Sequence, residues 1–237
     1  MNDQYLLLWL EAPLQSWGHD SKFGRRDTLD FPTKSGVLGL ICCALGAGGP
    51  QVEWLARWLS LDMQIAAFMR TDGIGRPLAR PPLLRDFHMV GSGYDDRDPW
   101  QNLLIPKTSD GKKAVGGGTK MTYRYYLQDA AFAAAVQVPA EYQDSVVEAL
   151  KNPVWDLYLG RKSCVPTELI FQGVHANADS AFAAALEIAA LKRRCEALRV
   201  LQGEHEGEVF TLNDVPAQFG DHKKYRDRRV TVQVVER

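Results

Sequence analysis

The chain lacks a strong charge of either sign. Its 237 residues include 28 lysine and arginine residues against 29 aspartate and glutamate residues, and the formal net charge is -1 at pH 7. Proteins that coat nucleic acid without discrimination usually carry a strongly basic balance, so the composition excludes that class. Any nucleic acid bound by this chain must therefore be held by local basic patches.

Cysteine and histidine are also scarce. The chain has four cysteines and five histidines. Cys42, Cys43, Cys164 and Cys195 show no C-x-x-C spacing and no paired histidine pattern. These spacings indicate neither a zinc site nor a redox pair, so we expect no metal ion and no cofactor.

Long apolar runs are absent as well. No uninterrupted apolar stretch is long enough to cross a bilayer, and the start Met-Asn-Asp-Gln lacks the basic region of a signal peptide. With 46% hydrophobic and 24% charged residues, the composition is that of a globular protein. The sequence therefore predicts a cytoplasmic protein that makes no membrane contact.

Two segments concentrate positive charge. Residues 107–124 hold five basic residues against one acidic residue, and residues 223–229 hold five more against Asp227. A solvated charge run is the usual explanation for either segment. The first segment differs because tyrosines follow its lysines, and unpaired bases stack on such rings.

The segment Phe31–Gly39 offers another candidate contact. It opens a predicted helix with Lys34 and Ser35, and the free N–H groups of a helix start carry a partial positive charge that suits a phosphate. The alternative is purely structural, with Ser35 as an ordinary helix cap and Trp17 as an anchor of the core. The local sequence leaves both interpretations open.

Apolar periodicity predicts the order of the elements. Strands are expected at 5–10, 64–70, 132–138 and 168–174, and helices at 36–45, after Pro50 and at 142–150. The resulting order, β-α-β-β-α-β, is typical of an α+β ferredoxin-like domain. This is the fold of RNA-recognition modules, whose sheet is the platform that binds RNA.

The connection between the second and third predicted strands is unusually long. About sixty residues, 71–131, replace the usual hairpin turn. Strand-like segments at 83–90 and 122–127 predict a long hairpin or arm with a basic tip. In the last third we expect a helix at 180–188, a hairpin that pairs 198–201 with 209–212, and a strand at 230–235.

Five motifs together point to a family. The segments LxLxAPLQSWG, FPTKSGVLGLICCALG, RDFHMVG, TYRYYLQDAAF and PVWDLYLGRKSCVP occur in this order between residues 8 and 166. The combination resembles the Cas-five family of CRISPR-associated proteins, in its type I-E branch. The resemblance covers roughly residues 4–174.

This resemblance implies a noncatalytic subunit of a type I-E Cascade surveillance complex, which supports RNA-guided DNA targeting in antiviral defence. It implies a ferredoxin-like (RRM-like) palm at residues 1–177, an inserted thumb at about 72–130, and a smaller β-rich C-terminal extension at 178–237. The implied partners are the 5′ handle of the crRNA, the Cas-seven backbone that the thumb caps, the large Cascade subunit and, indirectly, target DNA.

The expected RNA contacts follow from the motifs and from the basic patch. Arg124 beside Tyr123 and Tyr125 would supply both a cation and stacking rings. Gly160, with no side chain, would let the backbone of its loop approach an RNA closely. The full set of predicted RNA-binding residues is Gln15, Ser16, Trp17, Lys34, Ser35, Arg85, His88, Lys107, Lys112, Lys113, Lys120, Tyr123, Arg124, Arg161 and Lys162.

Two other functions remain open from the sequence. Relatives in type I-C systems cut repeat RNA, and His88, Tyr123 and Lys120 would supply the base, acid and cation of a metal-independent endoribonuclease. A protein adaptor is the other alternative, since Trp100 and the apolar segment 103–105 would suit a partner surface. The resemblance to the type I-E branch favours the noncatalytic function, because it implies that a separate Cas-six enzyme cuts the RNA.

Overall fold

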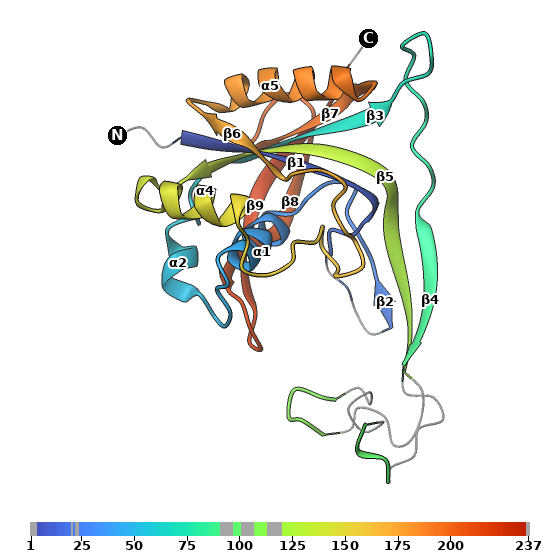
Figure 1. Cartoon of the computed structure of the whole chain (residues 1–237), viewed down its shortest axis with the longest axis vertical. Helices are drawn as coiled ribbons and strands as arrows, with labels where there is room; N and C mark the ends of the chain where they lie inside the picture. Colours follow the sequence, from blue (N-terminus) through green and yellow to red (C-terminus); the bar gives the residue numbers. More distant parts are fainter. Residues whose placement is uncertain are drawn as a thin grey trace.

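One large, mostly antiparallel sheet dominates the fold, and helices cover both of its faces (Figure 1). The computed structural model describes residues 4–19, 21, 24–90, 97–100, 107–112 and 120–235. In this part of the chain the strands follow the order β6-β1-β5-β3-β7-β9-β8, and β2 and β4 pair with β5 off this path. No helix of the described part is both long and apolar enough to cross a membrane.

The elements have the following bounds. The strands are β1 (Gln4–Gln15), β2 (Arg25–Arg26), β3 (Met63–Arg70), β4 (Leu84–Val90), β5 (Lys120–Val138), β6 (Phe171–His175), β7 (Arg194–Gln202), β8 (Glu208–Gln218) and β9 (Lys224–Val234). The helices are α1 (Lys34–Ala44), α2 (Val52–Ala56), α4 (Gln143–Lys151) and α5 (Ala178–Leu191), with a 3-10 turn at Ala140–Tyr142 before α4. The predicted strands at 64–70 and 168–174 and the helices at 36–45, 142–150 and 180–188 are confirmed, with small shifts of their ends.

The strand β1 is buried on both faces. Leu6, Leu8 and Leu10 belong to a core shared with α1 and α4, whereas Leu7 and Trp9 belong to a second core under α5. Figure 1 shows α5 on one side of the sheet, and α1 and α4 on the other. A nearly continuous apolar run is the pattern expected of a strand that is covered on both faces, so the predicted strand is confirmed and extends to residue 15.

The helix α5 occupies the sheet face that RNA-recognition modules use as their platform. Its alanines and Phe182 pack against Leu7, Trp9 and Phe68 in the second core. The ring centroids of Trp9 and Phe68 are 5.1 Å apart. The helix α5 therefore buries this face of the sheet.

The strand β5 is a single strand of 19 residues that runs out of the central sheet. Residues 127–138 pair with β1, whereas residues 120–126 pair with β4. We call β4 together with residues 120–126 the arm, and Figure 1 shows it projecting away from the body. The predicted pairing of 83–90 with 122–127 is thus confirmed, whereas most of the predicted basic tip lies outside the described residues. The two strands expected at 122–127 and 132–138 are one strand, because β5 is paired along its length.

The C-terminal strands extend the same sheet in an order that the sequence did not predict. The strand β9 lies between β7 and β8, so the expected hairpin of 198–201 with 209–212 is wrong. The loop between β7 and β8 crosses close to β9, where Gly207 has a φ of 132° and a Cβ would lie 2.6 Å from the carbonyl oxygen of Val232. The buried Thr231 holds this loop by donating from Oγ1 to the carbonyl oxygen of Gly203 at 2.9 Å.

Candidate nucleic-acid interface

Three residues of the PLQSWG motif hold the fold together. Gln15 is buried, and its Nε2 donates to two backbone carbonyl oxygens at 3.1 and 2.7 Å. The buried indole of Trp17 donates from Nε1 to Gln15 Oε1 at 3.1 Å. Ser16 Oγ donates to the carbonyl oxygen of Tyr125 at 3.2 Å and thereby ties β1 to the arm. The side chain of Gln15 is therefore turned into the protein, whereas Ser16 and Trp17 also line the cavity described below. The predicted RNA contacts of these three residues stay predictions.

The start of α1 is not an open phosphate site. Lys34 is 2% exposed, and its Nζ donates to two backbone carbonyl oxygens at 2.5 and 3.4 Å. The carboxylate of Asp214 in β8 occupies the position expected for a phosphate. Its Oδ2 accepts a hydrogen bond from the backbone N–H of Lys34 at 2.8 Å. Thr33 Oγ1 accepts from the backbone N–H of Gly36 at 3.1 Å. The predicted phosphate contact of Lys34 is therefore wrong.

Lys34 makes the stability of the protein depend on pH. Burial, together with the charge of Arg228, lowers the pKa of Lys34 from its ordinary value of 10.5 to about 8, against the opposing effect of Asp214 and Asp62. Between these values the unfolded chain binds more protons than the folded protein, so the free energy of unfolding rises with pH. We expect the free energy of unfolding of the wild type, taken relative to that of the Lys34→Met variant, to increase by about 3 kcal/mol from pH 8 to pH 10.5. Urea unfolding of both proteins measures this difference, and a constant difference would contradict the prediction.

One face of the arm combines cations with aromatic rings. Directly paired residues of an antiparallel pair share a face, and Phe87 pairs with Tyr123 while Arg85 pairs with Tyr125. The ring centroids of Phe87 and Tyr123 are 5.2 Å apart. Arg85 Cζ lies 5.6 Å from the ring centroid of Tyr123, and Cζ of Arg25 from β2 lies 5.0 Å from that of Tyr125. We call these five residues the aromatic face.

The opposite face of the arm carries Arg124 and His88. Arg124 pairs with Asp86, and His88 pairs with Thr122. His88 Nδ1 lies 3.9 Å from a carboxylate oxygen of Asp86, and Arg124 Nε donates to Thr122 Oγ1 at 3.3 Å. The alternation of side chains along β5 therefore separates Arg124 from the tyrosines on either side of it. Arg124 and Tyr123 therefore face opposite sides of the arm, and the RNA contact predicted for each stays a prediction.

Arg161 joins the loop after α4 to the base of the arm. Its Nη1 donates to the carbonyl oxygen of Tyr125 at 3.2 Å, and its Nη2 donates to that of Arg26 at 2.8 Å. The guanidinium Cζ lies 4.5 Å from the ring centroid of Tyr126. Arg161 thus already has protein partners, and its first role is to position β2 and β5 relative to the loop.

Gly160 permits a close backbone approach, although the partner is the protein itself. Its φ is 94°, and a Cβ on this residue would lie 1.7 Å from the carbonyl oxygen of Ser16. The backbone N–H of Ser16 donates to the carbonyl oxygen of Leu159 at 3.2 Å. The close approach that Gly160 permits is thus to the end of β1, and its predicted approach to RNA stays a prediction. Lys162, two residues later, is exposed to solvent.

The predicted lysines near the arm tip are only partly described. Lys107 and Lys112 are exposed. Lys113 lies outside the described residues, and for Lys120 the structure describes only the backbone, which begins β5. The RNA contacts of these four lysines stay predictions.

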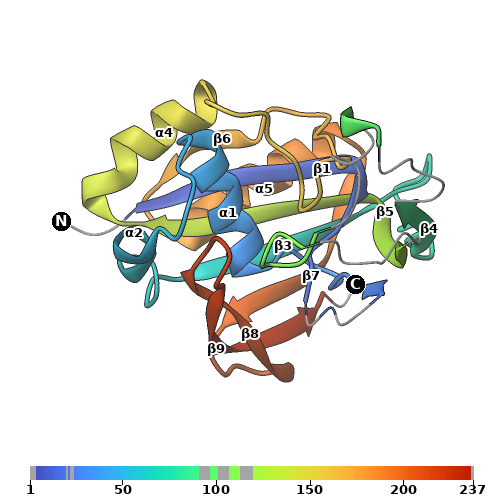
Figure 2. The ribbon, with the colours of Figure 1, turned by 90° about the horizontal axis from the view of Figure 1, so that it is seen from below.

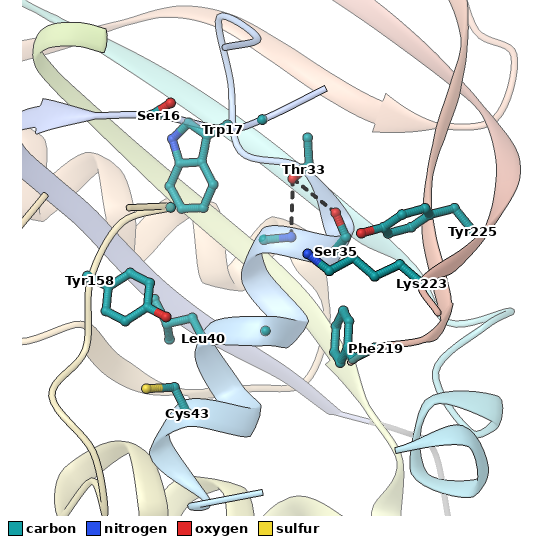
Figure 3. A pocket seen from close by; sticks show the side chains of 14 residues that line it. Ser16, Trp17, Thr33, Ser35, Leu40, Cys43, Tyr158, Phe219, Lys223 and Tyr225 are labelled. Atoms are coloured by element: carbon teal, nitrogen blue, oxygen red, sulfur yellow. Dashed lines mark hydrogen bonds between the residues drawn. The ribbon is translucent and has the colours of Figure 1, made fainter. Parts of the chain in front are cut away.

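A cavity of about 320 Å³ lies between α1 and the β8–β9 hairpin (Figure 3). Figure 2, seen from below, shows this hairpin reaching toward α1. The cavity is lined by Phe219, Lys223 and Tyr225 of this hairpin, together with Tyr158 and Ser35. A larger cavity of about 780 Å³ beside it is also lined by Ser35, Lys223 and Tyr225. The two cavities therefore share these three residues and Gly18.

Sequence reasoning missed the contribution of the C-terminal strands to this region. The signal was present in the basic segment 223–229, but nothing local indicates that it faces α1. In the described part of the chain, no group of three or more His, Cys, Asp or Glu side chains could hold a metal ion. The four cysteines are free thiols. The candidate interface thus consists of the aromatic face, the Arg161 loop and the cavity.

Comparisons with known proteins agree with one another. The family model described as "CRISPR-associated protein (Cas_Cas5)" matches residues 5–231. The "CRISPR system Cascade subunit CasD" of Escherichia coli (strain K12) is 32% identical over 180 residues, which are 74% of this chain and 73% of that protein. A chain of a solved "CRISPR RNA-guided surveillance complex" is 30% identical with a TM-score of 0.68, over 97% of this chain and 89% of that one. A "Crystal structure of Cas protein" is 26% identical with a TM-score of 0.57, over 97% of this chain and 94% of that one. The chain belongs to the Cas-five family of CRISPR-associated proteins.

Proposed function

We propose that this chain is a noncatalytic subunit of a type I-E CRISPR Cascade complex and that it binds the 5′ handle of the crRNA. Its family supports this proposal, as do two similar proteins whose names describe a Cascade subunit and an RNA-guided surveillance complex. In that complex the chain supports RNA-guided targeting of DNA in antiviral defence.

The observation that carries the proposal is the aromatic face of the arm. Single-stranded RNA is held by cations that follow its phosphates and by rings that stack on its unpaired bases. Arg25 and Arg85 lie over the rings of Tyr125 and Tyr123, and Tyr123 is 46% exposed. A chain with almost no net charge can hold RNA at such a local patch. Arg85 and Tyr123 therefore remain proposed contacts, and Arg25 and Tyr125 join them.

We also propose a ferredoxin-like palm for residues 1–177 and a thumb for residues 72–130. The strands β6, β1, β5 and β3 stand side by side in this order, and each neighbouring pair is antiparallel. The helices α1 and α4 pack on the same face of these strands. This arrangement supports the palm, the projecting arm corresponds to the thumb, and α5 with β7–β9 corresponds to the C-terminal extension.

The register of the arm favours holding RNA over cutting it. Metal-independent cleavage would require His88, Tyr123 and Lys120 to reach the same phosphodiester. Tyr123 belongs to the aromatic face, whereas His88 and Lys120 occupy register positions of the opposite face. The predicted catalytic set is thus divided between two faces of a strand pair, which supports the noncatalytic alternative.

The proposed protein partners are the Cas-seven backbone, capped by the thumb, and the large Cascade subunit, contacted by the palm. Exposed apolar side chains support protein contacts. Trp100 is 78% exposed, whereas the apolar segment 103–105 lies outside the described residues. Trp155 and Leu169 are two further exposed apolar side chains, with exposed fractions of 48% and 84%. These surfaces are compatible with an RNA-binding subunit that is also held by neighbours.

Charge reversal on the aromatic face tests the proposal. Arg25 already forms an ion pair with Asp27 at 2.8 Å, so Arg85 is the more informative position. We expect Arg85→Glu to weaken binding of 5′-handle RNA and to reduce the slope of log affinity against log salt by about 0.7, because one phosphate contact fewer releases fewer counterions. Fluorescence anisotropy with the full chain at several salt concentrations measures both quantities.

Two further variants show whether the effect is specific to the aromatic face. Arg57→Glu reverses an exposed arginine beside α2 and should leave the salt slope unchanged. Arg124→Glu reverses a cation on the opposite face of the arm and should have the smaller effect of the two arm variants. A slope that responds to Arg124→Glu and ignores Arg85→Glu would move the RNA away from the aromatic face and remove the main support for the proposal.

A further inference from the structure

The cavity between α1 and the β8–β9 hairpin has aromatic walls (Figure 3). Tyr158 stands on one side of it, and Phe219 and Tyr225 stand on the other. These rings come from the loop after α4, from the residue that follows β8 and from β9. Aromatic rings on the walls of a cavity are groups that a planar ligand can contact.

The floor of the cavity carries little side-chain bulk. Gly36 and Gly39 of α1 both line it. A Cβ on Gly36 would lie 2.8 Å from the ring of Trp17, so this glycine serves the packing of the core. A Cβ on Gly39 would meet nothing nearer than Phe219 Cζ at 4.0 Å. A side chain added at Gly39 would therefore enter the cavity without first displacing the core.

A cation stands where the aromatic cavity meets its larger polar neighbour. Lys223 lines both cavities, as do Ser35 and Tyr225. Burial raises the pKa of Tyr225, so its hydroxyl stays neutral and can donate a hydrogen bond. The mouth of the cavity thus offers an ammonium group and two hydroxyl groups next to the aromatic rings.

The carboxylates that border the larger cavity are already engaged. Asp214 pairs with Arg228, whose Nε and Nη2 donate to its two oxygens at 2.7 and 2.9 Å. Asp227 Oδ1 accepts a hydrogen bond from Asn213 Nδ2 at 2.6 Å. The ion pair with Arg228 lessens the repulsion that a phosphate beside Lys223 would meet from Asp214.

Segments that line the cavity are hydrogen-bonded to the base of the arm. Ser16 lines the cavity, and its Oγ donates to the carbonyl oxygen of Tyr125 on the aromatic face. Gly160 lines it as well, and the next residue, Arg161, donates to the same carbonyl oxygen. The lining of the cavity is therefore hydrogen-bonded to the backbone of the arm at Tyr125.

We infer that the cavity seats one unstacked base of a single-stranded RNA, with the base between the facing rings and its phosphate beside Lys223. The inference rests on the proposed function, because it concerns the same RNA. A side chain of a partner protein is the competing occupant. The adjoining cation and polar cavity favour a nucleotide, since a nucleotide brings a phosphate with its planar base.

The test uses single-stranded RNA of the 5′-handle sequence in which one nucleotide at a time is made abasic. We expect the wild-type chain to lose about tenfold in affinity for one of these RNAs, the size of one lost base–ring stack. Tyr225→Leu and Gly39→Leu should lose about tenfold with intact RNA and should then be insensitive to the abasic substitution at that position. Anisotropy titrations give the affinities, and thermal unfolding shows that each variant is folded.

Matched controls come from the same hairpin. Phe210 and Tyr225 are both 37% exposed, but Phe210 lines neither cavity, so Phe210→Leu should behave as the wild type. Lys224 follows Lys223 directly and also lines neither cavity. Lys223→Ala should therefore weaken binding and reduce its salt dependence, whereas Lys224→Ala should do neither.

Three results would overturn the inference. If wild type and cavity variants respond alike to every abasic position while Arg85→Glu still weakens binding, the base lies elsewhere and the proposed function stands. If the variants bind RNA normally but no longer assemble with a Cascade partner protein, the cavity holds a protein side chain. If the wild-type chain binds no handle RNA, alone or within the assembled complex, the proposed function fails together with the inference.

Discussion

Replacing Gly160 with alanine is expected to lower the free energy of unfolding by about 3–5 kcal/mol, because two separate costs combine. The residue has a φ of 94°, which an L side chain rarely adopts, and the added Cβ would lie 1.7 Å from the carbonyl oxygen of Ser16. That oxygen belongs to the backbone and cannot rotate away. The loop or the end of β1 must therefore shift, and urea unfolding measures the cost.

Gly75→Ala is the matched control for this prediction. Gly75 has a φ of 84°, but a Cβ on it would meet nothing within 4 Å. Its substitution therefore reports the backbone conformation alone, and we expect a loss of about 1 kcal/mol. Equal losses for the two variants would show that the contact with Ser16 is not tight. The larger shift at Gly160 should also weaken RNA binding, because the same loop carries Arg161 and lines the cavity.

Asp214→Ala is expected to destabilise the protein by about 3–5 kcal/mol, the usual cost of breaking a buried ion pair from one side. Asp214 and Arg228 are 2% and 8% exposed, and Arg228 donates two hydrogen bonds to the carboxylate. The carboxylate also accepts from the backbone N–H of Lys34 at the start of α1. Its removal leaves the buried cation Arg228 unpaired near Lys34 and loosens the C-terminal strands from α1.

The double variant Asp214→Ala with Arg228→Met separates charge from packing. Because the unpaired guanidinium is removed, we expect this variant to recover a large part of the lost stability in urea unfolding. Glu141→Ala is the surface comparison, since Glu141 and Arg57 form an ion pair at 2.9 Å with both side chains well exposed. That change should cost less than about 1 kcal/mol. A double variant no more stable than Asp214→Ala would show that the helix-start contact, rather than the ion pair, carries the energy.

The sequence predicts many of the segments that form the candidate interface, but the prediction did not assign each residue to a face of its strand. The period of two along β5 is present in the sequence, and it is enough to separate Tyr123 from Arg124 once the strand is assumed. A prediction that groups Arg124 with Tyr123 because they are neighbours in the chain ignores this period. The partners across the strand pair, such as Phe87 for Tyr123, depend on the register of β4 with β5. That register needs tertiary information, because residues 91–119 separate the two strands.

The apolar elements and the family can be predicted from local patterns of the sequence. Runs and periods of apolar residues encode β1, β3, α1, α4 and α5, because burial of a strand or helix face is a local pattern, and the ordered motifs identify Cas-five proteins. Only the tertiary structure decided that Lys34 is buried, that Gly160 touches Ser16, and that β9 separates β7 from β8. Each of these depends on a contact between distant segments, such as the backbone N–H of Lys34 with Asp214, 180 positions apart. A local pattern shows that a side chain can be buried, but the partner that makes its burial favourable is chosen by the packing of the whole chain.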